Sequence, residues 1–300
     1  MSDKTLIVLI GPTAIGKTTA SIQIAKILSC PIISADSRQF FKEMSIGTAK
    51  PNKEEMHGVT HFMIDSHSIF DDINVGKFET EVIALLETLH QTNKTVILVG
   101  GSGLYIDAVC KGFDELPEAN INIRNQITLL LEEKGIESLQ LLLKELDPAY
   151  YLKVDLLNPQ RISRALEVCL STGKTYSELR EGNIKKRNFK IIKIGLNTSR
   201  ELVYNRINRR VDEMMEAGLL EEVKMLQPHK HLNALQTVGY SELFDYLENK
   251  VDLKTAVESI KQNSRKFAKR QLTWFRRDQG IKWFEPNAIP EILHFLKTQL

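Results

Sequence analysis

Residues 11–18 read Gly-Pro-Thr-Ala-Ile-Gly-Lys-Thr, and this stretch decides the fold of the chain. It has the spacing of a phosphate-binding loop, because Gly11 and Gly16 stand five positions apart and are followed by Lys17 and Thr18. The glycines let backbone N–H groups converge on an anion at a helix N-terminus, while the lysine supplies a charge and the threonine can ligate Mg²⁺. A chance glycine turn is the alternative, but an apolar run precedes the loop and a helical pattern follows it. The stretch therefore predicts a bound diphosphate or triphosphate.

Short apolar runs like the one before this loop recur through the first hundred residues. Continuous Ile, Val and Leu runs are typical of strands buried on both faces, and the helical stretches between them imply right-handed crossovers between parallel strands. The fold class predicted is α/β, with a parallel sheet core of the P-loop NTPase type. We expect its first strands at Thr5–Ile10, Pro31–Ala35, His61–Asp65 and Thr95–Gly100.

The middle of the chain carries no strand signal. Only helical periodicity is present from Asp114 to Asn188, after which the strand-like run Phe189–Leu196 resumes the sheet and helical patterns continue to Arg277. We expect residues 1–113 and 189–300 to form one catalytic core, interrupted by a helical insertion at residues 114–188.

Composition limits the class of protein. The 300 residues are 42% hydrophobic and 26% charged, which argues against collagen-like, disordered and coiled-coil classes. The net charge of +2 does not by itself indicate a nucleic-acid binder. Cys30, Cys110 and Cys169 are odd in number and far apart, which favours reduced thiols over a disulfide framework or a zinc site. The apolar run near the N-terminus is too short for a signal peptide or a membrane span, so we expect a cytoplasmic protein without membrane contact.

Asp36 follows the second predicted strand. P-loop NTPases usually hold Mg²⁺ with an aspartate at the end of an apolar strand, yet the run Thr95–Gly100 ends in glycines. The run Pro31–Ala35 instead brings Asp36 to the sheet edge where open parallel sheets bind their ligands. Asp36 could be a base or a metal ligand there, or it could cap a helix over residues 37–44, because Asp and Ser favour N-caps. Spacing leaves both interpretations open.

Two arginine pairs each share one face of a predicted helix. Arg206 and Arg210 are four positions apart and could reach an anion together, or they could form surface ion pairs with nearby carboxylates. Arg161 and Arg164 lie on one face of the insertion, where an RNA contact and a plain surface pair are equally compatible with the spacing.

The most basic stretch of the chain is Lys261–Arg277. Its cations suit RNA backbone contact, whereas Ile260, Phe267 and Trp274 recur every seven residues, which is typical of a buried stripe. We therefore assign these aromatic residues to the core and the cations to RNA. The cations are Arg265, Lys266, Lys269, Arg270, Arg276 and Arg277.

Seven blocks follow one another along nearly the whole chain: GPTAIGKTT, SADSRQFFKEMSIGTAKP, VGGSGLYI, NPQRISRALEV, RRVDEMMEAGLLEEV, TVGYSEL and KRQLTWFRR. Their identity and order resemble those of the tRNA dimethylallyltransferases, the bacterial tRNA isopentenyltransferases. The resemblance implies transfer of a dimethylallyl group from its diphosphate to the exocyclic amine of the adenosine 3′ of the anticodon. It also implies Mg²⁺ as cofactor and the anticodon stem-loop of tRNA as partner, and we expect a monomer.

The resemblance also implies roles for particular residues. Asp36 corresponds to the general base, Thr18 to a diphosphate and metal contact, and Arg210 to a residue that neutralises the leaving group, with Lys17 beside them. The donor would be held by Gly11, Pro12, Thr13, Ala14, Ile15, Gly16, Lys17 and Thr18. Contacts to tRNA would come from Asp36, Ser37, Arg38, Gln39, Ser102, Arg124, Gln160, Arg161, Ile162, Ser163, Arg164, Gln236, Thr237, Val238, Gly239, Tyr240 and Ser241.

Four positions depart from the family pattern: Phe41 stands where Tyr is common, Ser45 where Asp is common, Ser102 where Thr is common, and Asn158 where Asp is common. None of them removes an inferred catalytic group. Three other functions remain as alternatives: a prenyltransferase for free adenine nucleotides, a small-molecule kinase with the same loop, and a non-catalytic RNA-binding module. The helical insertion and the basic helix favour a macromolecular acceptor over a mononucleotide, and the phosphate-binding loop disfavours a module without catalysis.

Overall fold

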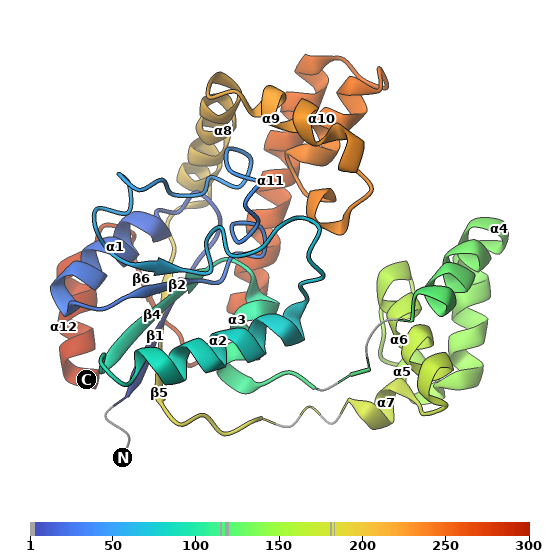
Figure 1. Ribbon diagram of the computed structural model, residues 1–300, viewed down its shortest axis with the longest axis horizontal. Coiled ribbons are helices and arrows are strands. Elements are labelled where there is room, and N and C mark those ends of the chain that lie inside the picture. Colours follow the sequence, from blue (N-terminus) through green and yellow to red (C-terminus); the bar gives the residue numbers. More distant parts are fainter. Residues whose placement is uncertain (1–3, 115, 118–119, 181, 183) are drawn as a thin grey trace. The chain divides into compact units, whose positions relative to one another are not determined.

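A computed structural model describes residues 4–114, 116, 117, 120–180, 182 and 184–300. The chain divides into two units (Figure 1). The larger unit comprises Met1–Cys110 and Arg187–Leu300, and the smaller comprises Lys111–Lys186. The predicted insertion, residues 114–188, covers nearly the same part of the chain as the smaller unit.

The larger unit is built on a parallel sheet in the order β3-β2-β4-β1-β5-β6, so the predicted fold class is confirmed. Its strands are β1 (Thr5–Ile10), β2 (Ile32–Ser34), β3 (His61–Phe62), β4 (Thr95–Gly100), β5 (Lys190–Leu196) and β6 (Lys282–Phe284). In β1, which lies between β4 and β5, alternate side chains enter opposite cores. Leu6, Val8 and Ile10 pack on one face, and Ile7 and Leu9 pack on the other. This arrangement explains the continuous apolar run, because a central parallel strand is covered on both faces.

Helices cover both faces of the sheet. The core that contains Ile7 includes residues of α1 (Lys17–Leu28), α8 (Arg200–Glu216) and α12 (Ile289–Gln299). The core that contains Leu6 includes residues of α2 (Val75–Leu89), α3 (Gly103–Lys111), α9 (Leu219–Leu226), α10 (Tyr240–Leu247) and α11 (Leu253–Phe275). Two short 3-10 helices, η1 (Gln227–His229) and η2 (Asn233–Leu235), precede α10.

Several details differ from the predicted elements. Strand β2 lacks one residue at each end of the predicted run Pro31–Ala35, and β5 begins one residue after Phe189. The strand predicted at His61–Asp65 ends after Phe62, because Met63 and Asp65 adopt positive φ angles of 59° and 52°. Strand β6 was not predicted, since three residues after a helix carry too little periodicity to be recognised. Residues 37–44 form turns, without the helix that an N-cap at Asp36 would have started.

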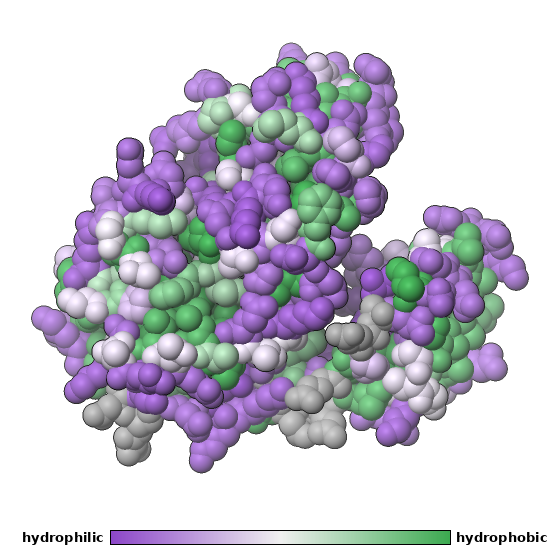
Figure 2. Space-filling model, in the orientation of Figure 1, coloured by the Kyte–Doolittle hydropathy of each residue, from purple (hydrophilic) through white to green (hydrophobic). Residues whose placement is uncertain are grey.

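The smaller unit contains α4 (Ile121–Leu146), α5 (Pro148–Tyr151), α6 (Pro159–Thr172) and α7 (Tyr176–Leu179). Its core is made by α4 and α6, with Leu139, Leu143 and Leu166 fully buried. Hydrophobic side chains also reach its surface, and Leu152 is 83% exposed. Green patches among purple ones mark this mixture in Figure 2. None of the helices in the described part of the chain combines the length and apolar character required to cross a bilayer.

Candidate functional site

The phosphate-binding loop joins β1 to α1 in a conformation that regular secondary structure cannot adopt. Gly16 has φ 104°, where glycine is free of the Cβ penalty, and Ala14 has φ 60°. The first turn of α1 begins directly afterwards at Lys17. The predicted strand, loop and helix are therefore all confirmed, and the positive end of the α1 dipole faces the loop.

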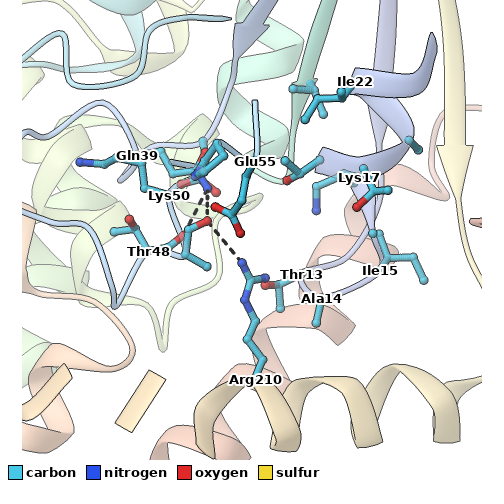
Figure 3. A pocket seen from close by; sticks show the side chains of 18 of the residues that line it. Thr13, Ala14, Ile15, Lys17, Ile22, Gln39, Thr48, Lys50, Glu55 and Arg210 are labelled. Carbon is cyan, nitrogen blue, oxygen red and sulfur yellow. Dashed lines mark hydrogen bonds between the residues drawn. The ribbon is translucent and has the colours of Figure 1, made fainter. Parts of the chain in front are cut away.

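A cavity of about 1270 Å³ opens beside this loop in the larger unit. It is lined by the loop and α1, by the segment after β2, by residues 45–57, and by α8 and α11 (Figure 3). Most of the predicted catalytic and donor-binding residues line it, whereas Gly11, Pro12, Ser37, Arg38, Ser102 and the segment 236–241 do not. The predicted residues that do are Thr13, Ala14, Ile15, Gly16, Lys17, Thr18, Asp36, Gln39, Arg206 and Arg210.

Lys17 is the cation deepest in the loop. Its Nζ donates hydrogen bonds to the carbonyl oxygens of Gly11 at 3.0 Å and Pro12 at 2.8 Å. Burial lowers the pKa of Lys17 to about 8, with the Asp36 carboxylate opposing this shift and Arg210 adding to it. The positive charge of Lys17 therefore lacks the solvation of an exposed lysine, and an anion in the cavity would stabilise it.

The affinity for a diphosphate should fall as the pH rises above about 8. In the ligand-free protein Lys17 is protonated below this pH and loses its charge above it, so the loss approaches about tenfold per pH unit. Calorimetric titration with inorganic pyrophosphate between about pH 7 and pH 9.5 measures this effect. In a Lys17→Arg variant the guanidinium keeps its charge, so the fall in affinity that Lys17 causes should vanish even if the affinity is lower. If the affinity of the wild-type protein did not change over this pH range, the prediction would be wrong.

Asp36 lies where the sequence placed it, beyond the carboxyl end of β2 at the cavity wall. Its Oδ1 accepts a hydrogen bond from the backbone N–H of Arg38 at 3.0 Å, which makes a local turn of the kind that Asp favours. The N-cap interpretation is wrong in its strict form because no helix follows. The same charge opposes the lowering of the pKa of Arg210 and of Lys17 that burial causes.

Arg206 and Arg210 face the cavity from α8, so the surface ion-pair interpretation is wrong for both. Arg206 Nη1 donates to the carbonyl of Ile15 in the phosphate-binding loop at 3.0 Å. Arg210 Nη2 lies 3.5 Å from the carbonyl of Ala49. Figure 3 shows the Arg210 side chain between the phosphate-binding loop and the segment that contains Thr48. The ion pair with Glu213 is made by the intervening, exposed Arg209.

Gln271 of α11 is a site residue that no spacing rule predicts. Its buried amide accepts a hydrogen bond from the N–H of Thr13 at 2.8 Å and donates one to the carbonyl of Gly101 at 2.9 Å. It thus ties the phosphate-binding loop to the segment after β4. One turn earlier, Phe267 lines the cavity and is 39% exposed, so its assignment to the core was wrong.

Several residues carried over as tRNA contacts are occupied within the protein. The hydroxyl of Ser102 accepts from the N–H of Ser37 at 3.0 Å. The side chains of Ile162 and Tyr240 are fully buried. The expectation that they contact RNA directly is therefore wrong for this structure. Among the other residues predicted in segments 160–164 and 236–241, Gly239 is buried. The rest are exposed or half-buried, namely Gln160, Arg161, Ser163, Arg164, Gln236, Thr237, Val238 and Ser241.

Arg124 and Arg164 of the smaller unit share one buried partner. Both donate to the carboxylate of Glu167, at 3.2 Å and 3.0 Å, and Arg164 also donates to the carbonyl of Pro117 at 2.8 Å. Glu167 is buried, so these pairs hold α6 to α4 and to the segment before it. Arg161 remains exposed on the same helix.

Three of the positions that depart from the family pattern make contacts within the protein. Asn158 caps α6 by accepting from the N–H of Arg161 at 3.2 Å, as an aspartate would. Phe41 is buried in the core, where its ring packs edge-on to Phe40. Ser45 contributes its backbone N–H to the carboxylate of Glu222.

Comparisons with known proteins show which family the chain resembles. The family model described as IPP transferase matches residues 39–278. The tRNA dimethylallyltransferase of Flavobacterium johnsoniae is 50% identical over 304 aligned residues, which cover 99% of this chain and 98% of that protein. A full-length tRNA isopentenylpyrophosphate transferase from Bacillus halodurans is similar in structure, with a TM-score of 0.73 and 36% identity over 99% of this chain and 96% of that chain. A eukaryotic dimethylallyltransferase acting on tRNA has a TM-score of 0.79 and 26% identity over 96% and 75% of the two chains.

Proposed function

This chain belongs to the IPP transferase family, and from that premise we propose that it transfers a dimethylallyl group from dimethylallyl diphosphate to tRNA. The acceptor is the exocyclic amine of the adenosine 3′ of the anticodon, and the products are N6-isopentenyladenosine and diphosphate. One observation carries the proposal at the level of geometry: Lys17, Arg210 and Asp36, two cations and one carboxylate, line a single cavity at the phosphate-binding loop.

The cations meet the main demand of the reaction. An aromatic exocyclic amine is a poor nucleophile, so catalysis must stabilise the charge that moves onto the departing diphosphate. Lys17, Arg210 and the amino end of α1 supply positive charge that the fold already holds in place. Arg206 keeps the loop in position from the side, through its hydrogen bond to Ile15.

The carboxylate meets the second demand. As the carbon–nitrogen bond forms, the amine becomes acidic and must lose a proton. Asp36 lines the same cavity as the two cations, and we propose that it accepts this proton.

Mg²⁺ fits this site as a companion of the diphosphate. It prefers oxygen ligands, keeps several waters, and commonly binds through substrate phosphates. In the described part of the chain no group of three or more His, Cys, Asp or Glu side chains could hold a metal by itself. We propose that the Thr18 hydroxyl, at the start of α1 in the cavity, contributes one oxygen, and that the ion supplies further neutralisation of the leaving group.

The kinase alternative lacks a component of the usual site. Strand β4 ends at Gly100 and is followed by Gly101, so this strand does not place an aspartate beside the phosphates. Asp36 comes from β2 instead.

A transfer assay separates the candidates. The protein is incubated with labelled dimethylallyl diphosphate, Mg²⁺ and either unmodified tRNA or AMP, and in parallel with labelled ATP. The proposal expects label in tRNA alone. Label in AMP would favour the free-nucleotide enzyme, and transfer from ATP would favour the kinase.

Recognition of tRNA is assigned to exposed cations on α11 and in the smaller unit. Lys266, Lys269 and Arg270 are exposed, and the guanidinium of Arg270 lies 5.7 Å from the ring centre of Phe267. Arg265 is half-buried and donates to Asn208 at 2.6 Å, so part of its role is structural. In the smaller unit we propose Arg161 as the exposed contact. The need for tRNA also leads us to propose a cytoplasmic location.

Reversing two of these charges should weaken tRNA binding. In Lys269→Glu/Arg270→Glu, two phosphate contacts are lost, so the slope of log affinity against log salt should shrink by about 2. Binding is measured with the anticodon stem-loop over a series of salt concentrations. Lys254→Glu, an exposed reversal near the start of the same helix, is the control, and pyrophosphate affinity should be the same in all variants. An unaltered slope would mean that Lys269 and Arg270 are solvated surface residues that do not contact tRNA.

A further inference from the structure

Glu222 of α9 is a buried carboxylate that the proposed chemistry does not use. Only 7% of the residue is exposed. Its Oε2 accepts hydrogen bonds from the N–H groups of Ser45 at 3.0 Å and Ile46 at 2.8 Å, and its Oε1 accepts one from the N–H of Gly47 at 3.0 Å. The hydroxyl of Tyr240 donates to the same Oε1 at 2.6 Å. Four donors on one buried carboxylate satisfy its charge and attach the loop to α9.

The loop that Glu222 holds, residues 44–50, contains a residue in an unfavourable conformation. Ala49 has φ 46°, in the left-handed region that residues with a Cβ rarely adopt. Such a conformation persists only where the surrounding contacts determine the backbone. The N–H of Ala49 donates to the carbonyl of Ile46 at 3.0 Å, and the N–H of Lys50 donates to that of Ser45 at 3.1 Å. The two residues that hold this turn are therefore among the three that Glu222 anchors.

The turn directs a carbonyl oxygen to the catalytic side of the cavity. The carbonyl of Ala49 lies 3.5 Å from Nη2 of Arg210 and accepts from Nε2 of Gln39 at 3.2 Å. Dashed lines mark these contacts in Figure 3. Arg210 is half-buried, and burial lowers its pKa, so a nearby acceptor has more influence on its position than it would in water.

Tyr240 belongs to the same arrangement. Its ring is fully buried, and a Cβ at Gly47 would lie 2.5 Å from a ring atom, so only glycine lets the loop pack against the ring. The hydroxyl faces Glu222, which excludes a direct role of that hydroxyl in RNA binding without a change of structure.

We propose that Glu222 and Tyr240 are positioning residues that hold Arg210 in its working place through the 44–50 loop. Glu222 clamps the loop, the loop maintains the turn at Ala49, and the Ala49 carbonyl orients the guanidinium toward the diphosphate. The inference rests on the proposed function in one respect, the role of Arg210 at the diphosphate.

A double-mutant cycle on pyrophosphate binding tests this relation. Glu222→Gln keeps the shape but leaves at least one loop N–H without its acceptor, so the affinity for inorganic pyrophosphate should fall about tenfold. In an Arg210→Ala background the same change should cost less than about twofold, because the residue through which it acts is gone. Equal factors in both backgrounds, or no loss in either, would overturn the proposal.

Two further variants separate positioning from folding. Tyr240→Phe keeps the ring and removes one donor, so it should give a smaller loss, about threefold, that also disappears with Arg210→Ala; this variant decides the question if Glu222→Gln does not fold. Glu79→Gln is the matched control, a buried glutamate of α2 paired with Arg187 and outside the cavity. It should lower the melting temperature without changing pyrophosphate affinity. If Glu79→Gln lowered the affinity as much as Glu222→Gln does, the role of Glu222 would be structural only. The transfer assay on the wild type tests the proposed function separately, since pyrophosphate binding requires no turnover.

Discussion

Replacing Asp36 with asparagine should slow dimethylallyl transfer by about 10²-fold or more, because it removes the proposed acceptor of the amine proton. The amide keeps the size of the carboxylate, and its oxygen can still accept the hydrogen bond from the N–H of Arg38. The turn after β2 should therefore persist, and tRNA and pyrophosphate should bind with nearly unchanged affinity. Single-turnover transfer at saturating donor and tRNA measures the chemical step apart from binding.

A cap substitution elsewhere supplies the control for Asp36. Asp252 caps α11 by accepting from the N–H of Thr255 at 2.6 Å, so Asp252→Asn shows what the loss of a turn or cap carboxylate does to stability. It should leave the transfer rate unchanged. If Asp36→Asn behaves like Asp252→Asn, with a retained rate and only a lower melting temperature, then Asp36 is a structural residue and the base must be sought elsewhere.

Replacing Lys17 with alanine should reduce donor-dependent transfer by about 10²- to 10³-fold, the scale seen when one preorganised donor to developing charge is removed. The backbone N–H groups of the loop remain, so residual binding is expected. The melting temperature should not fall together with the transfer rate. Burial lowers the pKa of Lys17 below its usual value, so its charged form is disfavoured in the folded protein, and removing it should not lower the melting temperature.

The matched control is a second lysine with little exposed surface. Lys193 of β5 lies outside the cavity and pairs with Asp278 at 2.5 Å. Lys193→Ala should lower the melting temperature and leave pyrophosphate affinity intact, the reverse of the pattern for Lys17→Ala. Unchanged donor affinity and turnover in Lys17→Ala would contradict the assignment of residues 11–18 as the donor site.

Much of the fold was predictable because its signals are local. The continuous apolar runs at residues 5–10 and 95–100 became strands with the predicted bounds, since a strand buried on both faces must be apolar along its whole length. The failures also have local causes. His61–Phe62 stops early because the following backbone turns into the left-handed region, and β6 is too short to show a period.

The candidate site, like the fold, was predictable only in part. The loop at residues 11–18 and the place of Asp36 followed from spacing and from the rule that ligands lie at the carboxyl ends of parallel strands. Spacing placed Arg206 and Arg210 on one face but could not say whether that face meets solvent or the cavity. It also could not foresee that Glu167 would bind both Arg124 and Arg164.

The sequence by itself determined the parallel α/β core, the phosphate-binding loop and the position of the candidate base, because the signal for each lies in residues within a few positions of one another. Only the tertiary structure decided which distant residues hold the loops of the site in place. Gln271 reaches Thr13 across 258 positions, and Glu222 reaches Ser45 across 177. Such contacts depend on how α9 and α11 dock against the sheet, and docking is set by the packing of apolar faces. The apolar pattern of a helix therefore predicts its buried face, but it does not predict which neighbouring polar residue makes a contact.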